Sequence, residues 1–272
     1  MPEFALLAMA MLCTGVAAGI LAGLLGVGGG IVVVPVLEWV LELMNVDAAV
    51  RMHIAVATSL AVIIPTSISS SRAHYKRGAV DTKLVKRWMP FIFLGAVAGT
   101  FIAGRVDGQV LTAVFATVAL LVALKMVLPL DKVTLAPEVP RGVAIAAVPV
   151  AIGTISTMMG IGGGTLSVAS LTLMSVPIHR AIGTAALFGL LISIPGALGF
   201  IYMGFGNELL PAGSLGYVNL IGFAFIAPTT ILAAPLGAKF AHALSQRHLS
   251  LLFGAFLLLV SVRMLSQTLH TG

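Results

Sequence analysis

Ten apolar segments joined by short connections make up most of this 272-residue chain. Their approximate limits are 4–25, 31–44, 53–71, 88–104, 110–128, 142–159, 164–177, 180–204, 216–237 and 249–268. About 20 apolar residues cross a ~30 Å hydrocarbon layer as a helix. Because hydrophobic residues form 59% of the chain and charged residues only 9%, we predict an all-α, polytopic integral membrane helical bundle.

A run of four glycines in five residues interrupts the apolar pattern twice. The runs are Gly26 to Gly30 (GVGGG) and Gly160 to Gly164 (GIGGG). Glycine inside a helix costs about 1 kcal/mol per position relative to alanine, so each run predicts a helix break. The segments that follow, 31–44 and 164–177, extend only ~21 Å as helices. They predict half-helices that start inside the membrane, where surrounding protein shields irregular backbone.

The breaks divide the chain into two similar halves of five segments each. His53 to Ser59 (HIAVATS) aligns with His179 to Ala185 (HRAIGTA), which indicates an internal duplication. An odd number of crossings inverts the second copy relative to the first. We therefore expect a first transmembrane repeat at 1–128, a linker at 129–141 with three prolines, and an inverted second repeat at 142–272.

The basic residues predict the orientation in the membrane. Six Lys and Arg residues cluster from Arg72 to Arg87, and counting crossings from there places twelve basic residues on one side and three on the other. Lys and Arg mark cytoplasmic loops. We expect a bacterial-type cytoplasmic (inner) membrane, a cytoplasmic linker, and N- and C-termini outside. The net charge of +6 then reflects topology rather than a nucleic-acid partner.

Inverted repeats place paired helix breaks near a central axis, where many secondary transporters bind substrate. The free N–H groups and positive dipole ends of both half-helices would face one volume there and favour an anion. Close helix packing is the alternative role of the glycines, and back-bonding within a helix is the alternative for the threonines. The candidate substrate-binding residues are Gly26, Gly28, Gly29, Gly30, Gly160, Gly162, Gly163, Gly164, Thr165, Thr58, Ser59 and Thr184.

Three ionisable residues are candidates for coupling transport to an ion such as H+ or Na+. Glu38 lies on the first half-helix, where an ionisable group at membrane depth is a functional candidate; the alternative places it at the outer interface beside Trp39. His53 and His179 match between the halves, and the alternative places both at the membrane interface. Because the sequence has no dinucleotide fingerprint, P-loop or zinc-ligand spacing, we expect no catalysis, cofactor or metal.

These motifs resemble the TauE/SafE family of membrane transporters, which includes sulfite and organosulfonate carriers. The first glycine run occurs with Pro35 and with Ala57 to Ser59 (ATS), and the second with Arg180 to Thr184 (RAIGT). The similarity covers about residues 5–268. Ala169 stands where the second half would repeat Pro35, so the second half-site is expected to bind less tightly or to bend differently. The resemblance implies movement of a small sulfur oxyanion or sulfonate.

Residues and resemblance together predict a secondary transporter that moves a small sulfur-containing anion by alternating access between the two halves. Two alternatives remain open. One is an anion channel that uses the same helix ends, and the other is a membrane scaffold or assembly protein in which the glycines only pack helices. The partners expected are the small anionic substrate, the lipid bilayer and a coupling ion.

Overall fold

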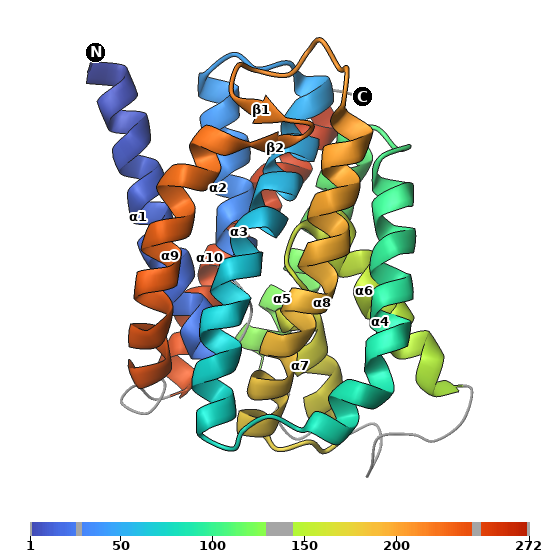
Figure 1. The fold of residues 1–272 in the computed structure, drawn as a ribbon. Helices are drawn as coiled ribbons and strands as arrows, with labels where there is room; N and C mark the ends of the chain where they lie inside the picture. Colours follow the sequence, from blue (N-terminus) through green and yellow to red (C-terminus); the bar gives the residue numbers. More distant parts are fainter. Residues whose placement is uncertain (1, 26–28, 129–143, 241–245, 271–272) are drawn as a thin grey trace.

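The computed structural model describes residues 2–25, 29–128, 144–240 and 246–270. This part of the chain forms ten helices and one short hairpin (Figure 1). The helices are α1 (Pro2–Leu25), α2 (Gly30–Leu43), α3 (Ala48–Lys76), α4 (Thr82–Ala103), α5 (Gly108–Val127), α6 (Ala144–Met159), α7 (Gly164–Leu173), α8 (Ile178–Gly204), α9 (Leu220–Phe240) and α10 (Gln246–His270). The predicted linker at 129–141 lies outside the described residues.

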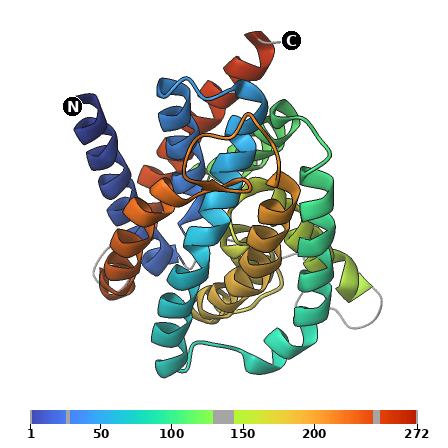
Figure 2. The ribbon, with the colours of Figure 1, turned by 45° about the horizontal axis from the view of Figure 1, so that its top comes forward.

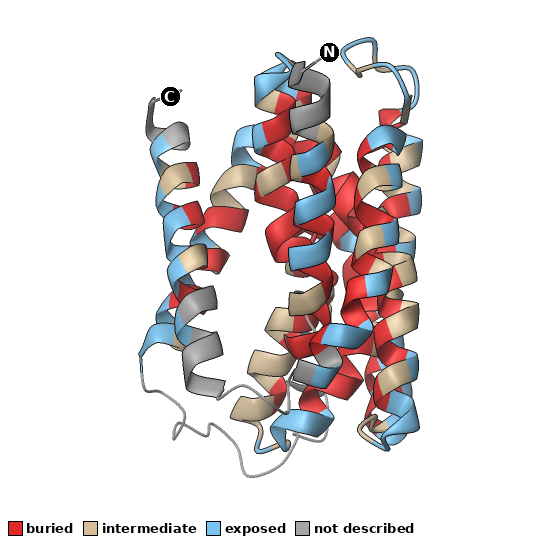
Figure 3. Cartoon of the chain, turned by 90° about the vertical axis from the view of Figure 1, so that its left-hand side faces the viewer, coloured by how far each residue is buried: buried red, intermediate tan, exposed pale blue. Residues whose placement is uncertain are grey.

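All ten predicted apolar segments contain a helix, which confirms the all-α class. Among the described residues, α3, α4, α5, α8 and the Leu220–Gly237 part of α9 are long and apolar enough to cross a membrane. Large apolar side chains lie on the outside of the bundle: Leu232 is 74% exposed and Leu259 is 68% exposed. Figure 3 shows buried residues gathered where helices meet and exposed residues facing outward. Such an apolar exterior suits lipid rather than water.

The short helices α2 and α7 follow the glycine breaks and end in the same way. Asn45 and Ser175 adopt left-handed φ values of 54° and 60°. In both helices the N–H of the following residue bonds, at 3.0 Å, to the carbonyl five positions earlier, which closes the last turn. The sequence predicts a seventh segment reaching residue 177, but this turn ends α7 at Leu173.

Helices of the first half pack on helices of the second. α1 lies on α9 and α6 on α4, while α3 contacts α9 and α8 contacts α4. The half-helices α2 and α7 lie against α3 and α8, and direct pairs join α3 to α8 and α5 to α10. If each helix is replaced by its counterpart in the other half, the contacts named here form the same set of pairs. Figure 2 shows α1 and α9 on one flank, α4 on the other, and α3 with α8 between them.

Two threonines that match between the halves hold the starts of two long helices. Thr58 Oγ1 accepts the backbone N–H of Asn219 at 2.9 Å, and the Asn219 side chain caps the first turn of α9. Thr184 Oγ1 accepts the backbone N–H of Asp81 at 3.0 Å, and Asp81 caps α4. The same residue type therefore performs the same structural task in each half.

A short hairpin connects α8 to α9, where the sequence predicts an apolar segment from residue 216. Its antiparallel strands are β1 (Ser214–Leu215) and β2 (Val218–Asn219). Gly216, with φ 53°, lies in the turn, and Tyr217 beside it stacks on the His53 ring at 5.0 Å. The hairpin thus covers one end of α3 and delays the start of α9 to Leu220.

We expect Thr58→Val and Thr184→Val each to lower the free energy of unfolding by about 1–3 kcal/mol, because each leaves the backbone N–H of a helix-capping residue without its hydrogen-bond partner. Thr112→Val is the matched control, since the Thr112 hydroxyl bonds to the Gly108 carbonyl of its own helix at 2.9 Å. Denaturant unfolding of the purified protein measures the difference. Equal losses in all three variants would contradict the role given to Thr58 and Thr184.

Candidate functional site

The two glycine breaks share one backbone geometry. Gly29 and Gly163 precede α2 and α7 and adopt left-handed conformations with φ 76° and 75°. Gly160 and Gly162 also have positive φ, at 68° and 65°. Residues with a Cβ atom adopt this region at a cost of roughly 1–2 kcal/mol, so glycine is required by the turn itself. Of the predicted residues, Gly26 and Gly28 lie outside the described part of the chain.

The breaks lie against each other inside the bundle. A Cβ atom added to Gly30 would collide with the carbonyl oxygen of Gly160 and would lie 2.9 Å from the Ser59 hydroxyl oxygen. Ser59 Oγ donates a hydrogen bond to that same carbonyl at 2.7 Å. All three residues are buried. The structure therefore brings the start of α2 against the second glycine break, with Ser59 of α3 linking them.

The half-helices leave this meeting point in opposite directions, α2 towards the hairpin end of the bundle and α7 towards the other end (Figure 1). Neither Gly29 nor Gly163 supplies a side-chain hydrogen bond to the first turn of its helix. The first N–H groups of a helix have no partner within it, and they carry its positive dipole end. The two N-termini together form an environment that favours negative charge.

Three hydroxyls gather around the second break. Ser156 on α6 is fully buried, and its Oγ lies 3.4 Å from the position that a Cβ atom of Gly163 would take. Thr165 and Ser167 are on α7. Within the described chain, the side-chain oxygens of these three residues are buried and have no hydrogen-bond partner. Buried hydroxyls without partners are uncommon, so they are available as donors to a bound oxyanion.

Sequence reasoning identified Thr165 but missed Ser156 and Ser167. The search depended on matched positions, and the residues that occupy the equivalent positions of the first half are apolar: Ala22 for Ser156 and Val33 for Ser167. No signal in the sequence distinguishes these serines from packing residues. Only their burial beside the break without a partner singles them out.

The predicted hydroxyls of Thr58 and Thr184 face other helices. Both are fully buried, and both accept the backbone N–H groups that precede α9 and α4. Of the hydroxyls predicted on the third and eighth segments, Ser59 is the one that contacts a glycine break. A direct role of Thr58 and Thr184 in binding stays a prediction.

The candidate coupling residues lie in different surroundings. Glu38 is buried on α2, with 8% of its surface exposed. His53 is buried as well, and its Nε2 lies 3.1 Å from the carbonyl oxygens of Ala103 and Val106. His179 is exposed at the start of α8. The histidines match in sequence but not in burial, and a coupling role stays a prediction for all three residues.

One basic side chain from each half reaches the half-helix of the opposite half. Arg263 on α10 forms an ion pair with Glu42 of α2, at 3.0 Å between Nη2 and Oε2, and Arg51 contacts the same carboxylate at 3.5 Å. Lys125 on α5 donates from Nζ to the Ala169 carbonyl of α7 at 3.4 Å. Each contact holds a half-helix from the far half. The contact on α2 is the more extensive one.

The sequence profile described as "Sulfite exporter TauE/SafE" matches residues 11–264. The chain belongs to the TauE/SafE family. A "Probable membrane transporter protein" of Haemophilus influenzae is 38% identical, covering 93% of this chain and 96% of the relative. A protein with a similar name from Methanocaldococcus jannaschii is 27% identical, with 97% of both chains covered. No solved structure matches the chain.

Membership of the TauE/SafE family, together with the apolar helices, makes this an integral membrane protein. The names of its relatives indicate a membrane transporter and not an enzyme. Among the described residues, no group of three or more His, Cys, Asp or Glu side chains could hold a metal ion. The two breaks and the hydroxyls beside them are therefore the candidate site of this TauE/SafE protein.

We expect Ser156→Ala to leave the stability of the anion-free TauE/SafE protein unchanged or slightly higher, because the Ser156 hydroxyl has no hydrogen bond to lose. Ser59→Ala is the matched comparison. It removes the bond to the Gly160 carbonyl and should cost about 1–3 kcal/mol. Thermal unfolding in the same detergent compares the two, and a larger loss for Ser156→Ala would contradict the assignment of Ser156 as an unpaired donor.

Proposed function

We propose that this chain is a secondary transporter that binds a small sulfur-containing anion, sulfite or an organosulfonate, between its two helix breaks. The observation that carries the proposal is the contact between the breaks. Gly30 lies against Gly160, and two helix N-termini without side-chain caps begin there. The family described as a sulfite exporter supports the substrate class.

The expected affinity suits a carrier, which must release what it binds. A helix N-terminus contributes up to ~2 kcal/mol to an anion in a partly buried geometry. Two N-termini then give about 4 kcal/mol, which corresponds to a dissociation constant near ~1 mM. Each hydroxyl donor from Ser156, Thr165 or Ser167 would add about 1 kcal/mol. No buried cationic side chain is needed for this range.

Binding between the breaks requires them to move apart, because Gly30 and Gly160 are in contact. In the proposed cycle, this contact belongs to a closed arrangement of the site. The packing of the two halves supports two inverted repeats, since exchanging the halves preserves most of the helix contacts, although α3–α5 and α5–α6 have no strong counterparts. Alternating access follows if the halves move against each other around the breaks.

We infer a cytoplasmic membrane location with both termini outside. α1 begins and α10 ends at the hairpin end of the bundle (Figure 1). Arg72 and Lys76 lie near the opposite end, where α3 finishes, and the basic segment that follows predicts the cytoplasmic side. The proposed anion would therefore exchange between the cytoplasm and the outer compartment.

The decisive experiment measures anion flux in proteoliposomes that contain a variant with one additional methyl group. In Gly30→Ala the new Cβ atom meets the Gly160 carbonyl, and overpacking of about 1–3 kcal/mol should lower counterflow of labelled sulfite or isethionate roughly tenfold or more. Gly108→Ala is the control. Its added Cβ atom would lie 3.3 Å from the nearest atom, and Gly108 is the first residue of α5, a helix that contains neither break.

Three outcomes would contradict the proposal. If Gly30→Ala transports the anion at the wild-type rate, the breaks do not belong to the transport path. Sustained conductance without counterflow would indicate a channel. Equal loss of folding and flux would favour a purely packing role.

A thermal-shift panel tests the substrate class independently. Sulfite, sulfate, sulfoacetate, isethionate, taurine and an aryl sulfonate are added to the purified protein. An anion present at ten times its dissociation constant should stabilise the folded state by about 1.4 kcal/mol. Ser156→Ala and Ser167→Ala should reduce that shift without unfolding the protein. The absence of a shift with every sulfur anion would contradict the substrate class.

A further inference from the structure

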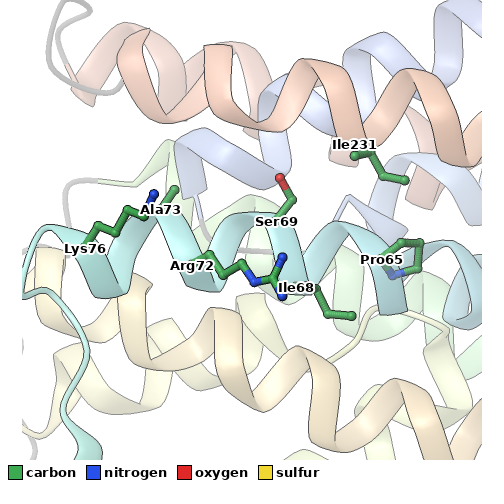
Figure 4. A pocket seen from close by; sticks show the side chains of 7 residues that line it. All are labelled: Pro65, Ile68, Ser69, Arg72, Ala73, Lys76 and Ile231. Carbon is green, nitrogen blue, oxygen red and sulfur yellow. The ribbon is translucent and has the colours of Figure 1, made fainter.

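A groove of about 500 Å³ lies between α3 and α9, on a different side of α3 from the breaks (Figure 4). Ile231 contributes from α9. The lining residues on α3 follow helical spacing along one stripe and are Pro65, Ile68, Ser69, Arg72, Ala73 and Lys76. Ser59 and Ile63, which contact the breaks, lie on the opposite face of α3 by the 3.6-residue period.

The groove opens to the outer surface of the bundle. Arg72 and Lys76 are exposed, and Leu232, next to Ile231 on α9, is 74% exposed. In a membrane protein such a surface faces lipid. A ligand in this groove would arrive from the bilayer rather than from the candidate site.

The groove changes from apolar to basic along its length. Pro65, Ile68 and Ile231 line one end, while Arg72 and Lys76 lie towards the end of α3. Figure 4 shows the Arg72 side chain extending back towards Ile68. The 11 positions from residue 65 to residue 76 span ~16 Å of helix, about half of a ~30 Å hydrocarbon layer. The groove therefore has about the depth of one leaflet, with its basic residues nearer the end of α3 that precedes the basic loop.

Arg72 and Lys76 form no ion pair within the described chain, and no acidic side chain lines the groove. The groove between α4 and α8, the counterpart helices of the other half, is smaller and lacks basic residues. It has a volume of about 150 Å³ and no charged residue in its lining. The groove between α3 and α9 is therefore both larger and more basic than the groove between α4 and α8.

We propose that the α3–α9 groove binds an anionic phospholipid from the leaflet on the side of the basic loop. The acyl chain lies along Pro65, Ile68 and Ile231, and Arg72 with Lys76 binds the headgroup phosphate. Basic pockets between transmembrane helices recognise anionic headgroups in this way. Because α3 and α9 belong to different halves, the lipid bridges the two halves on one side of the membrane.

Native mass spectrometry with phosphatidylglycerol and phosphatidylcholine of equal chain length tests the site. The wild type should retain phosphatidylglycerol preferentially. Each surface cation contributes about 1 kcal/mol towards anionic lipid, so Arg72→Gln/Lys76→Gln should weaken retention by roughly thirtyfold. The control Lys83→Gln/Lys86→Gln removes the same charge from exposed positions at the start of α4 and should retain the lipid as the wild type does.

A second variant and a soluble competitor test whether the groove itself holds the lipid. Ile231→Trp fills the groove without changing charge and should lower retention of phosphatidylglycerol. If this variant unfolds, the double glutamine variant decides, because both of its residues are exposed. Free glycerol 3-phosphate should not compete with the lipid. Competition by this soluble phosphate, equal retention in Arg72→Gln/Lys76→Gln, or equal loss in the Lys83 and Lys86 control would overturn the proposal.

Discussion

Hydrocarbon offers no hydrogen-bond partner to a backbone amide, so a helix that breaks inside a membrane must be enclosed by protein. The contact between the two glycine breaks meets this constraint. Each break shields the other, and Ser59 pairs with the Gly160 carbonyl. Gly30 lies too close to Gly160 to carry a side chain. Packing and anion binding are therefore not exclusive roles, since close approach of the breaks is what sets the uncapped helix ends beside each other.

Contacts between the halves position the elements around the breaks. Thr58 holds the start of α9 and Thr184 the start of α4. Arg263 and Lys125 reach α2 and α7 from the last helix of the opposite half. In each case one half orients a backbone segment of the other. Relative movement of the halves would therefore change the geometry of both half-helices together.

The two half-sites have the same backbone and different side chains. Gly29 and Gly163 have nearly equal φ values, but unpaired hydroxyls gather at the second break, on Ser156, Thr165 and Ser167. The absence of a second proline at Ala169 predicts a second half-site that binds less tightly or bends differently, whereas these hydroxyls favour stronger binding there. If an anion binds between the breaks, its oxygens are expected to contact the α6 and α7 side more closely.

The sequence by itself determined the helices, the breaks and the family, because apolar length and glycine runs act locally. It also determined the likeness of the halves, down to Thr58 and Thr184. Tertiary structure decided what those residues do, since the partners of Thr58 and Ser59 lie more than 100 positions away in the chain. It also decided the early end of α7, the hairpin, and the serines at the second break. Those features depend on which surfaces meet, and local pattern does not encode that.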